Sequence, residues 1–304
     1  MWRKIGRNYK KILVLLIILG VLLSIIILQI INSPEFKKKT QLKILSEQLK
    51  NTNHGDTFSP HGSDYYKAEE SADEIVKLGK EGIPIFLDAL KKHIHIPIIA
   101  QHIWQIRDNR IIPSLLEAIE LYKGTTSELW IRYALCKLNY EYEKNYAVFE
   151  GIMSNSDKEM SGSQNLMNPF QEGYTYKGRT AIILGKLGDD RSVEILIKTV
   201  LNEPRLKWDI VVALQYSCNP KATPILIKLL KEWHVSREDI DNIENIPNEP
   251  GMIRDAIIGV GACGGDEALP FLAELSEYKN NMILSSTAES LTYINDNKSC
   301  NLLM

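Results

Sequence analysis

The sequence has few of the motifs that mark a chemical site. Its four cysteines, among 304 residues, show no C-x-x-C spacing, which disfavours a structural zinc site and a disulfide framework. It also contains no nucleophile elbow and no glycine-rich phosphate loop following a strand pattern. We therefore expect no catalytic residues, no metal ligands and no cofactor.

Positive charge is scarce outside the N-terminal region. The first fifty residues hold ten of the 36 Lys and Arg and two of the 38 Asp and Glu, which leaves a net charge of −10 on the other 254. Binding to a phosphate backbone needs positive charge clustered on one face. This composition argues against a nucleic-acid partner.

The histidines and acidic residues are not spaced as metal ligands. His93 and His95 are two residues apart, so they point to different sides of a helix, and His102 belongs to a separate element. His54 and His61 lie in a segment without periodicity, which gives no rigid placement for ligands. The sequence indicates solvated or hydrogen-bonded side chains here.

One long apolar run stands near the N-terminus. Residues 12–31 carry no charge and, at about 1.5 Å per residue, would span roughly 30 Å, the thickness of a bilayer's hydrocarbon core. The run is longer than a signal-peptide core and lacks a small-residue cleavage site. We expect a retained transmembrane helix after a basic tail, residues 1–11. Basic residues flank both ends, but a short basic tail favours a cytoplasmic N-terminus with the rest of the chain outside.

A polar segment, residues 32–66, is predicted to tether this helix to the rest of the chain. Leu42, Leu45 and Leu49 indicate a short helix in it, and residues 51–64 lack periodicity.

The body of the chain repeats one helical pair. Leu184 and Leu187 lie on the stripe of a first helix, and Gly188 suits the left-handed conformation that ends it. Asp189 or Asp190 can then accept hydrogen bonds from the N–H groups that open a second helix. Two such short helices cannot bury their apolar faces alone, so the unit requires neighbours.

Counterparts of Leu184 recur at intervals of about thirty residues, with longer intervals at two places. They are Ile75, Ile103, Leu135, Leu184, Leu214, Val260 and Leu291. Prolines recur where second helices begin, at Pro84, Pro113, Pro224 and Pro270, a position that tolerates the missing N–H. The glycines Gly259, Gly261, Gly264 and Gly265 at a helix end indicate close helix packing rather than phosphate binding, because no strand precedes them.

These motifs resemble the short HEAT repeats found in bacteria and in bilin lyase subunits. The matching residues are Ala181, Leu184, Gly185, Leu187, Gly188, Asp189 and Val193, with Ile112-Pro113, Thr223-Pro224 and Leu269-Pro270 opening second helices. The turn at residues 139–142 departs from the pattern. The resemblance implies an all-α fold, an α-solenoid of about six repeats and a half repeat over residues 67–297, before a tail at 298–304.

The resemblance also implies a solenoid whose curved face binds a protein or peptide partner. The alternative is an enzyme or a cofactor-handling protein of the bilin-lyase type. Two insertions, residues 154–177 and 234–251, interrupt the repeats, and such insertions often lie on the binding face. Aromatic residues in or beside them are the predicted contacts: Phe170, Tyr174, Tyr176 and Trp233.

Most of the tryptophans Trp104, Trp130, Trp208 and Trp233 are expected to pack, because their places in the repeats differ. The last half repeat is rich in polar residues, among them Ser285, Ser286, Glu289 and Ser290, which predicts a final helix exposed to water.

Overall fold

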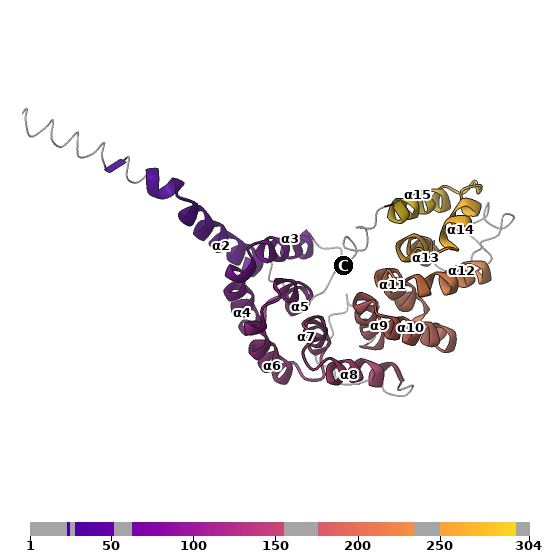
Figure 1. Cartoon of the computed structure of the whole chain (residues 1–304), viewed down its shortest axis with the longest axis horizontal. Helices are drawn as coiled ribbons and strands as arrows, with labels where there is room; N and C mark the ends of the chain where they lie inside the picture. The colour runs from indigo at the N-terminus through magenta and orange to yellow at the C-terminus, as the bar shows by residue number, and fades with distance from the viewer. Residues whose placement is uncertain (1–22, 25–27, 52–62, 155–175, 234–249, 296–304) are drawn as a thin grey trace, which may run out of the picture. The chain divides into compact units, whose positions relative to one another are not determined.

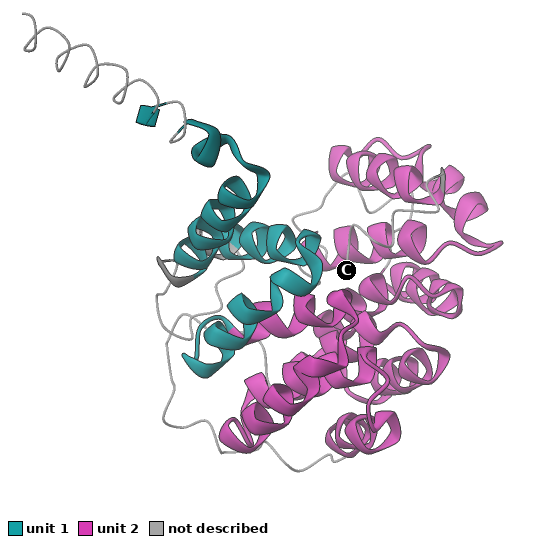
Figure 2. Cartoon of the chain, turned by 60° about the vertical axis from the view of Figure 1, so that its left-hand side comes forward, with its two compact units in different colours: residues 1–55, 60–95 teal, residues 56–59, 96–304 magenta. Residues whose placement is uncertain are grey.

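The computed structural model describes residues 23–24, 28–51, 63–154, 176–233 and 250–295, and every regular element in these ranges is a helix. The all-α prediction is confirmed for this part of the chain. The chain divides into two compact units (Figure 2). Unit 1 comprises residues 1–55 and 60–95, and unit 2 comprises residues 56–59 and 96–304.

Unit 1 is built from α2 (Pro34–Asn51), α3 (Ser63–Lys77), the 3₁₀ turn η1 (Gly79–Glu81) and α4 (Ile83–Lys91). α2 packs against both α3 and α4. Its Leu45 and Leu49 are buried, which explains why part of the predicted polar tether, residues 32–66, is a regular helix. Burial of these two leucines supplies the stabilisation that the polar composition lacks.

Unit 2 contains eleven of the described α-helices, α5 to α15. They are α5 (Ile96–Ile103), α6 (Ile112–Leu121), α7 (Thr126–Lys137), α8 (Tyr142–Ser154), α9 (Tyr176–Leu187), α10 (Asp190–Asn202), α11 (Lys207–Ser217), α12 (Thr223–Glu232), α13 (Pro250–Cys263), α14 (Ala268–Leu275) and α15 (Asn281–Asn295). Short 3₁₀ turns lie between them: η2 (Trp104–Ile106), η3 (Asn109–Ile111), η6 (Pro204–Leu206) and η7 (Pro220–Ala222).

The helices of unit 2 form two layers (Figure 1). The first layer consists of the odd-numbered helices α5 to α15, and each of them contacts the next odd-numbered helix. The second layer consists of the even-numbered helices α6 to α14. This stack of helix pairs is the arrangement that the α-solenoid prediction requires.

The repeated leucine position lies in the core. Its counterparts in the first layer from α5 to α13 are fully buried, and Ile75 of α3 is buried equally well within unit 1. Leu291 in α15 is only half-buried. The core register is therefore as predicted except in the last helix.

The predicted turn chemistry is also present. Gly188 has a φ of +70°, and the Ser192 N–H donates a hydrogen bond of 2.8 Å to Asp189 Oδ1 at the start of α10. Asp108 and Asn219 cap η3 and η7 in the same way. Prolines stand at the first positions of α4, α6 and α12, as predicted.

The irregular turn at residues 139–142 uses no glycine. Asn139 and Glu141 adopt positive φ angles of 55° and 41°. The Asn145 side chain donates hydrogen bonds to the carbonyl oxygens of Tyr140 and Glu141, at 3.0 and 3.3 Å. These bonds stabilise a left-handed backbone conformation, which costs free energy for residues other than glycine.

Glycines let the first-layer helices approach closely. A Cβ atom on Gly185 of α9 would lie 2.1 Å from the carbonyl oxygen of Ala213 in α11. A Cβ on Gly261 of α13 would lie 2.2 Å from the Ser290 carbonyl oxygen in α15.

The prediction of close packing is confirmed at Gly259 and Gly261. It is wrong at Gly264 and Gly265, where a Cβ atom would meet nothing closer than 3.6 Å and the positive φ angles of 68° and 87° show that these glycines form the turn after α13.

Close packing at α15 also corrects one prediction. Ser286 and Ser290 were expected to face water, but they are 1% and 0% exposed. The Ser290 hydroxyl donates a hydrogen bond of 2.7 Å to the Ile257 carbonyl oxygen. Serine suits this close contact between α13 and α15, because its side chain is small and its buried hydroxyl has a hydrogen-bond acceptor.

Several predicted features lie outside the described residues. These are the basic tail, most of the predicted transmembrane segment, most of both insertions and the C-terminal tail. In the ranges that are described, no helix combines the length and the apolarity needed to cross a bilayer.

Candidate interaction site

An exposed tryptophan marks the first layer where α11 begins. Trp208 is 43% exposed, although most large apolar side chains of unit 2 are buried. Its indole N–H donates a hydrogen bond of 3.2 Å to Asp255 Oδ2 in α13. The bond joins neighbouring helices and fixes the ring while leaving much of it accessible.

Gly251 lies beside the same ring. A Cβ atom at Gly251 would be 3.5 Å from Trp208 Cζ2, an ordinary contact distance. The indole therefore lies along the first turn of α13 and is held by that turn and by Asp255. We call Trp208, Gly251, Arg254 and Asp255 the Trp208 site.

Charged side chains lie near the contact between Trp208 and α13. Arg254 forms an ion pair of 3.3 Å with Glu289 of α15. Burial raises the pKa of Asp255, and the Trp208 N–H and Arg254 partly counter this rise. The Trp208 site thus offers an aromatic surface with an arginine and an aspartate close by, and aromatic residues and arginine are enriched at protein interfaces.

A second carboxyl group lies beside Trp208 in sequence but is buried. Asp209 is 9% exposed, and its Oδ2 is 2.3 Å from where a Cβ atom on Gly178 of α9 would lie. Burial raises the pKa of Asp209 to about 6, and Arg179 partly opposes the shift. The charged carboxylate is therefore an unfavourable element of the contact between α9 and α11.

The raised pKa of Asp209 predicts a pH-dependent stability. Because the folded pKa exceeds that of an unfolded aspartate, this group stabilises the fold most below about pH 4, and the contribution is lost as pH rises to about 6. Asp209→Asn should therefore raise the free energy of unfolding at pH 7 by about 1–3 kcal/mol relative to the wild type. Denaturant unfolding at pH 4 and pH 7 measures this difference.

Asp190→Asn provides a control of opposite sign. Hydrogen bonds from Asn219 and Lys221 lower the pKa of Asp190, so its contribution is present at neutral pH and lost in acid. Asp190→Asn should be slightly destabilising at pH 7. A pH-independent difference between the wild type and Asp209→Asn would contradict the buried-carboxylate account.

The residues predicted to contact a partner lie in different surroundings. Phe170 and Tyr174 are outside the described residues. Tyr176 opens α9 and is half-buried, and burial raises its pKa to about 12. Trp233 follows α12 and is 4% exposed, with the Lys207 ammonium 5.6 Å from its ring centroid. Their predicted role in partner binding stays a prediction.

Most of the four tryptophans in residues 67–297 are predicted to pack, and this is correct for Trp130 and Trp233, which are 2% and 4% exposed. Trp208 is an exception. It stands six residues before Leu214, as Arg254 stands six before Val260. In two other repeats the same place holds Leu129 and Gly178, which are buried, so the sequence holds no consistent signal that this position is exposed. The bond to Asp255 gave no signal, because it joins residues 47 apart in the chain.

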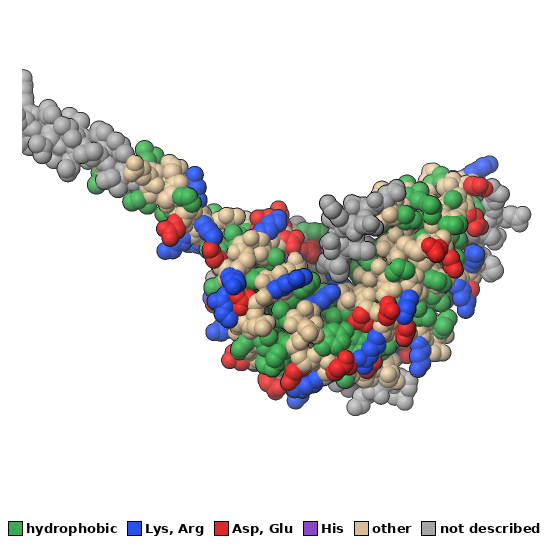
Figure 3. Space-filling view, in the orientation of Figure 1, with side chains coloured by type: hydrophobic (Ala, Val, Ile, Leu, Met, Phe, Trp, Pro, Cys, Tyr) green, Lys and Arg blue, Asp and Glu red, His purple; other side chains and the backbone are tan. Residues whose placement is uncertain are grey.

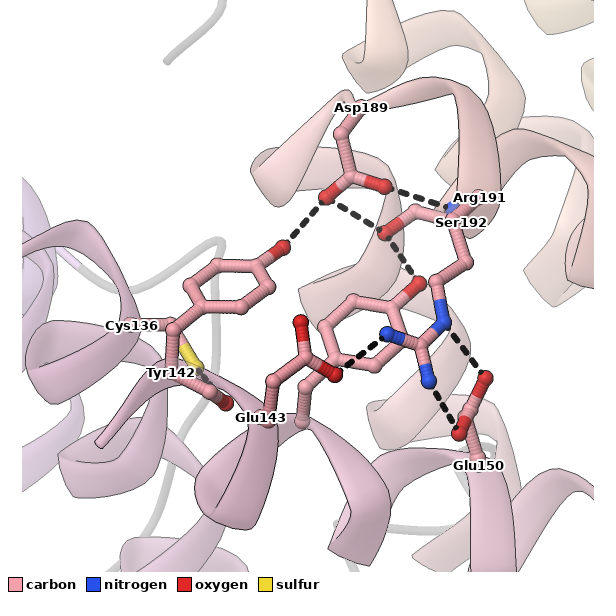
Figure 4. A network of polar contacts seen from close by, with 8 residues as sticks. Cys136, Tyr142, Glu143, Glu150, Asp189, Arg191 and Ser192 are labelled. Atoms are coloured by element: carbon pink, nitrogen blue, oxygen red, sulfur yellow. Dashed lines mark hydrogen bonds and ion pairs between the residues drawn. The ribbon is translucent and has the colours of Figure 1, made fainter. Parts of the chain in front are cut away.

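A polar network connects α8 with the turn between α9 and α10 (Figure 4). The Tyr142 hydroxyl donates a bond of 2.7 Å to Asp189 Oδ2, and the Ser192 hydroxyl donates a bond of 3.1 Å to the same oxygen. The Tyr146 hydroxyl lies 2.9 Å from Ser192 Oγ. Burial and Asp189 raise the pKa of Tyr142, so its hydroxyl stays a donor.

Arg191 extends the network along α8. Its guanidinium forms a bidentate ion pair with Glu150 and donates to Glu143 at 2.8 Å, above the Tyr146 ring. Nearby, burial raises the pKa of the Cys136 thiol to about 12, which keeps it protonated and unreactive. Nothing in this network activates a nucleophile, and we interpret it as a structural connection between repeats.

Metal and pocket geometry add no second candidate. In the described ranges, no group of three His, Cys, Asp or Glu side chains is placed to hold a metal ion. A shallow, open depression on α12 is lined by Pro224, Ile227, Lys228, Lys231 and Glu232. Its openness favours neither an enclosed ligand nor a cofactor.

Sequence comparisons place this chain in no known family. No protein-family model matches it, and no curated protein matches it.

Solved structures give low-scoring similarities. One is the complex of CpcE and CpcF of phycocyanin lyase from Nostoc sp. PCC7120, with 16% identity, a TM-score of 0.39, and coverage of 62% of this chain and 67% of the other. Another is human deoxyhypusine hydroxylase in complex with glycerol, with 11% identity, a TM-score of 0.34, and coverage of 86% and 99%. Neither similarity assigns an activity.

Proposed function

We propose that this chain is a HEAT-like binding scaffold, without catalysis, that holds a protein or peptide partner on the first layer of unit 2. The observation that supports this most strongly is Trp208, a ring 43% exposed and fixed by Asp255. Because the ring is fixed before binding, less conformational entropy is lost when a partner binds.

Tryptophan is suited to this role. Binding energy at protein interfaces concentrates in a few residues, among which Trp, Tyr and Arg are enriched. The Trp208 site offers Trp208 together with Arg254, on helices that are packed firmly through the close contacts of the first layer. The predicted contacts Tyr176 and Trp233 remain part of this proposal.

Surface charge favours a protein partner over a nucleic acid. On the face drawn in Figure 3, basic and acidic side chains of the described residues are interspersed. A mixed surface matches the −10 charge of the chain beyond residue fifty. Partners with mixed polar and apolar surfaces fit it better than a phosphate backbone does.

We further propose that residues 12–31 anchor the chain in a membrane, with the N-terminus cytoplasmic and the repeats outside. The uncharged run and its length support the anchor. Extraction of cell membranes with alkaline carbonate tests it, because a spanning helix stays in the pellet. Protease added to intact cells tests the orientation, because only an outward repeat domain is digested before lysis.

Photo-crosslinking of the full chain tests the binding face. A crosslinking amino acid at position 205, an exposed position close to Trp208, should capture a defined partner. Trp208→Ala should lower the yield of this adduct about tenfold or more, as expected for loss of an aromatic anchor. Trp208→Phe should reduce it less, because the ring remains while the bond to Asp255 is lost.

A crosslinker at position 121 is the control, since Leu121 is 62% exposed but lies on α6 in the second layer. It should not capture the same partner. An adduct at both positions, or one unaffected by Trp208→Ala, would contradict the proposed face. A chromophore that copurifies with the chain would favour the alternative of a cofactor-handling protein.

A further inference from the structure

We propose that the outward face of α2 is a contact surface for an anionic lipid bilayer. This inference rests on the proposed membrane attachment and extends it from the anchor to the first helix of unit 1. Its residues are Phe36, Lys37, Lys39, Lys43 and Ile44, here called the α2 outer face.

The two halves of α2 differ in exposure. In the C-terminal half, Leu45 and Leu49 are buried at 7% and 1%, where α2 packs on α3 and α4. In the N-terminal half, every residue from 34 to 41 is exposed. Unit 1 therefore holds α2 by one end and leaves the other end accessible.

The helical register separates an inward side from an outward one. Successive residues are about 100° apart, so Lys38 shares the side of Leu45 and Leu49. The Lys38 ammonium accordingly pairs with Glu81 of unit 1 at 2.5 Å. Phe36, Lys43 and Ile44 lie on the opposite side, with Lys37 and Lys39 at its two borders.

This outward side combines charge with apolar surface. Phe36 is 43% exposed and Ile44 is 48% exposed. In the described part of unit 1, neither Lys37 nor Lys39 has a carboxylate partner, and Lys43 reaches Glu47 only at 3.9 Å. Figure 3 shows apolar, basic and acidic side chains together along this helix.

The apolar component decides which occupant fits. Basic side chains alone would suit any polyanion, but a polyanion would leave Phe36 and Ile44 in water. Just before α2, Leu28, Ile30 and Ile31 are also exposed, at 57%, 54% and 46%. A bilayer covers apolar side chains in its interface and attracts lysines through anionic headgroups, each worth about 1 kcal/mol near the surface.

The test uses the full chain in vesicles of phosphatidylcholine, with or without phosphatidylglycerol. The rate of amine labelling at Lys37, Lys39 and Lys43 is measured by mass spectrometry. Phosphatidylglycerol should slow labelling severalfold, and high salt should reverse the effect. Exposed Lys80 and Lys91 serve as internal controls and should label equally in both vesicles.

Variants separate the two components. Lys37→Glu with Lys39→Glu should abolish the protection of Lys43, whereas Lys80→Glu with Lys91→Glu, an equal charge change elsewhere in unit 1, should preserve it. Phe36→Ser with Ile44→Ser should also weaken it. Equal labelling in both vesicle types would overturn the proposal. Protection of Lys43 that is as strong in the double serine variant as in the wild type would also overturn it, because it would indicate a general anion-binding surface.

The same samples distinguish this inference from the anchor. Flotation of the full chain with phosphatidylcholine vesicles after carbonate treatment reports insertion of residues 12–31. Carbonate-resistant flotation without lipid-dependent labelling would contradict the proposed α2 surface and support the anchor. If labelling depends on lipid and salt but the chain does not float after carbonate treatment, the α2 surface is supported and the anchor is contradicted.

Discussion

Gly185→Ala should lower the free energy of unfolding by about 3 kcal/mol or more, one of the largest effects expected from a single methyl group in this chain. The new Cβ would lie 2.1 Å from the Ala213 carbonyl oxygen and 2.8 Å from its Cα. The obstacle is backbone, so α9 and α11 must separate to admit it. Urea unfolding monitored by circular dichroism measures the loss.

Gly151→Ala is the matched control. Gly151 also lies inside a helix, α8, but a Cβ atom there would meet nothing within 4 Å. The substitution should stabilise the chain by about 0.5–1 kcal/mol, because alanine loses less backbone entropy in a helix. Similar effects at the two positions would show that Gly185 does not mediate a close contact.

Glu128→Ala should destabilise unit 2 by about 3–5 kcal/mol, because it leaves a largely buried guanidinium without its counter-charge. The side chains of Glu128 and Arg132 in α7 are 8% and 16% exposed. Arg132 Nε donates to Glu128 Oε1 at 2.7 Å, and the Gly124 N–H donates to Oε2 at 2.6 Å. Thermal unfolding of the variant should show a markedly lower midpoint.

A double-mutant cycle isolates the ion pair. In an Arg132→Met background, Glu128→Ala should cost much less, because it removes the Gly124 hydrogen bond but also a buried carboxylate that has lost its counter-charge. The difference between the two backgrounds is the coupling energy of the pair. Equal costs in both would mean that Glu128 acts only by capping the turn at Gly124.

Arg132 shows where sequence reasoning reached its limit. It occupies a position that is small or apolar in the other repeats, and the repeat pattern alone gave no reason for this exception. The structure supplies one, since Arg132 also donates to Asn145 Oδ1 at 3.0 Å and so braces the irregular turn before α8. The partners of a buried charge depend on contacts that a local pattern does not encode.

Local features were predictable because their causes lie within a few residues. Gly188 and Asp189 end one helix and start the next through interactions spanning three or four residues. The candidate site was predicted less well. Trp208 and Asp255 meet only because α11 and α13 stack in one particular register, and Ser290 is buried for the same reason in α15.

The glycine contacts have a mechanical consequence. From α9 to α15, Gly185 and Gly261 lie against backbone atoms of the next first-layer helix, and Gly259 lies against Gln215 of α11. Close-packed contacts of this kind have low compressibility, so α9, α11, α13 and α15 should resist deformation as one rigid unit. Neither α5 nor α7 contains a glycine, and just after α5 the ring of Trp104 in η2 packs against Tyr133 of α7, with ring centroids 6.5 Å apart. Rings can slide and tilt over one another, so elastic bending of unit 2 should concentrate there rather than beneath Trp208.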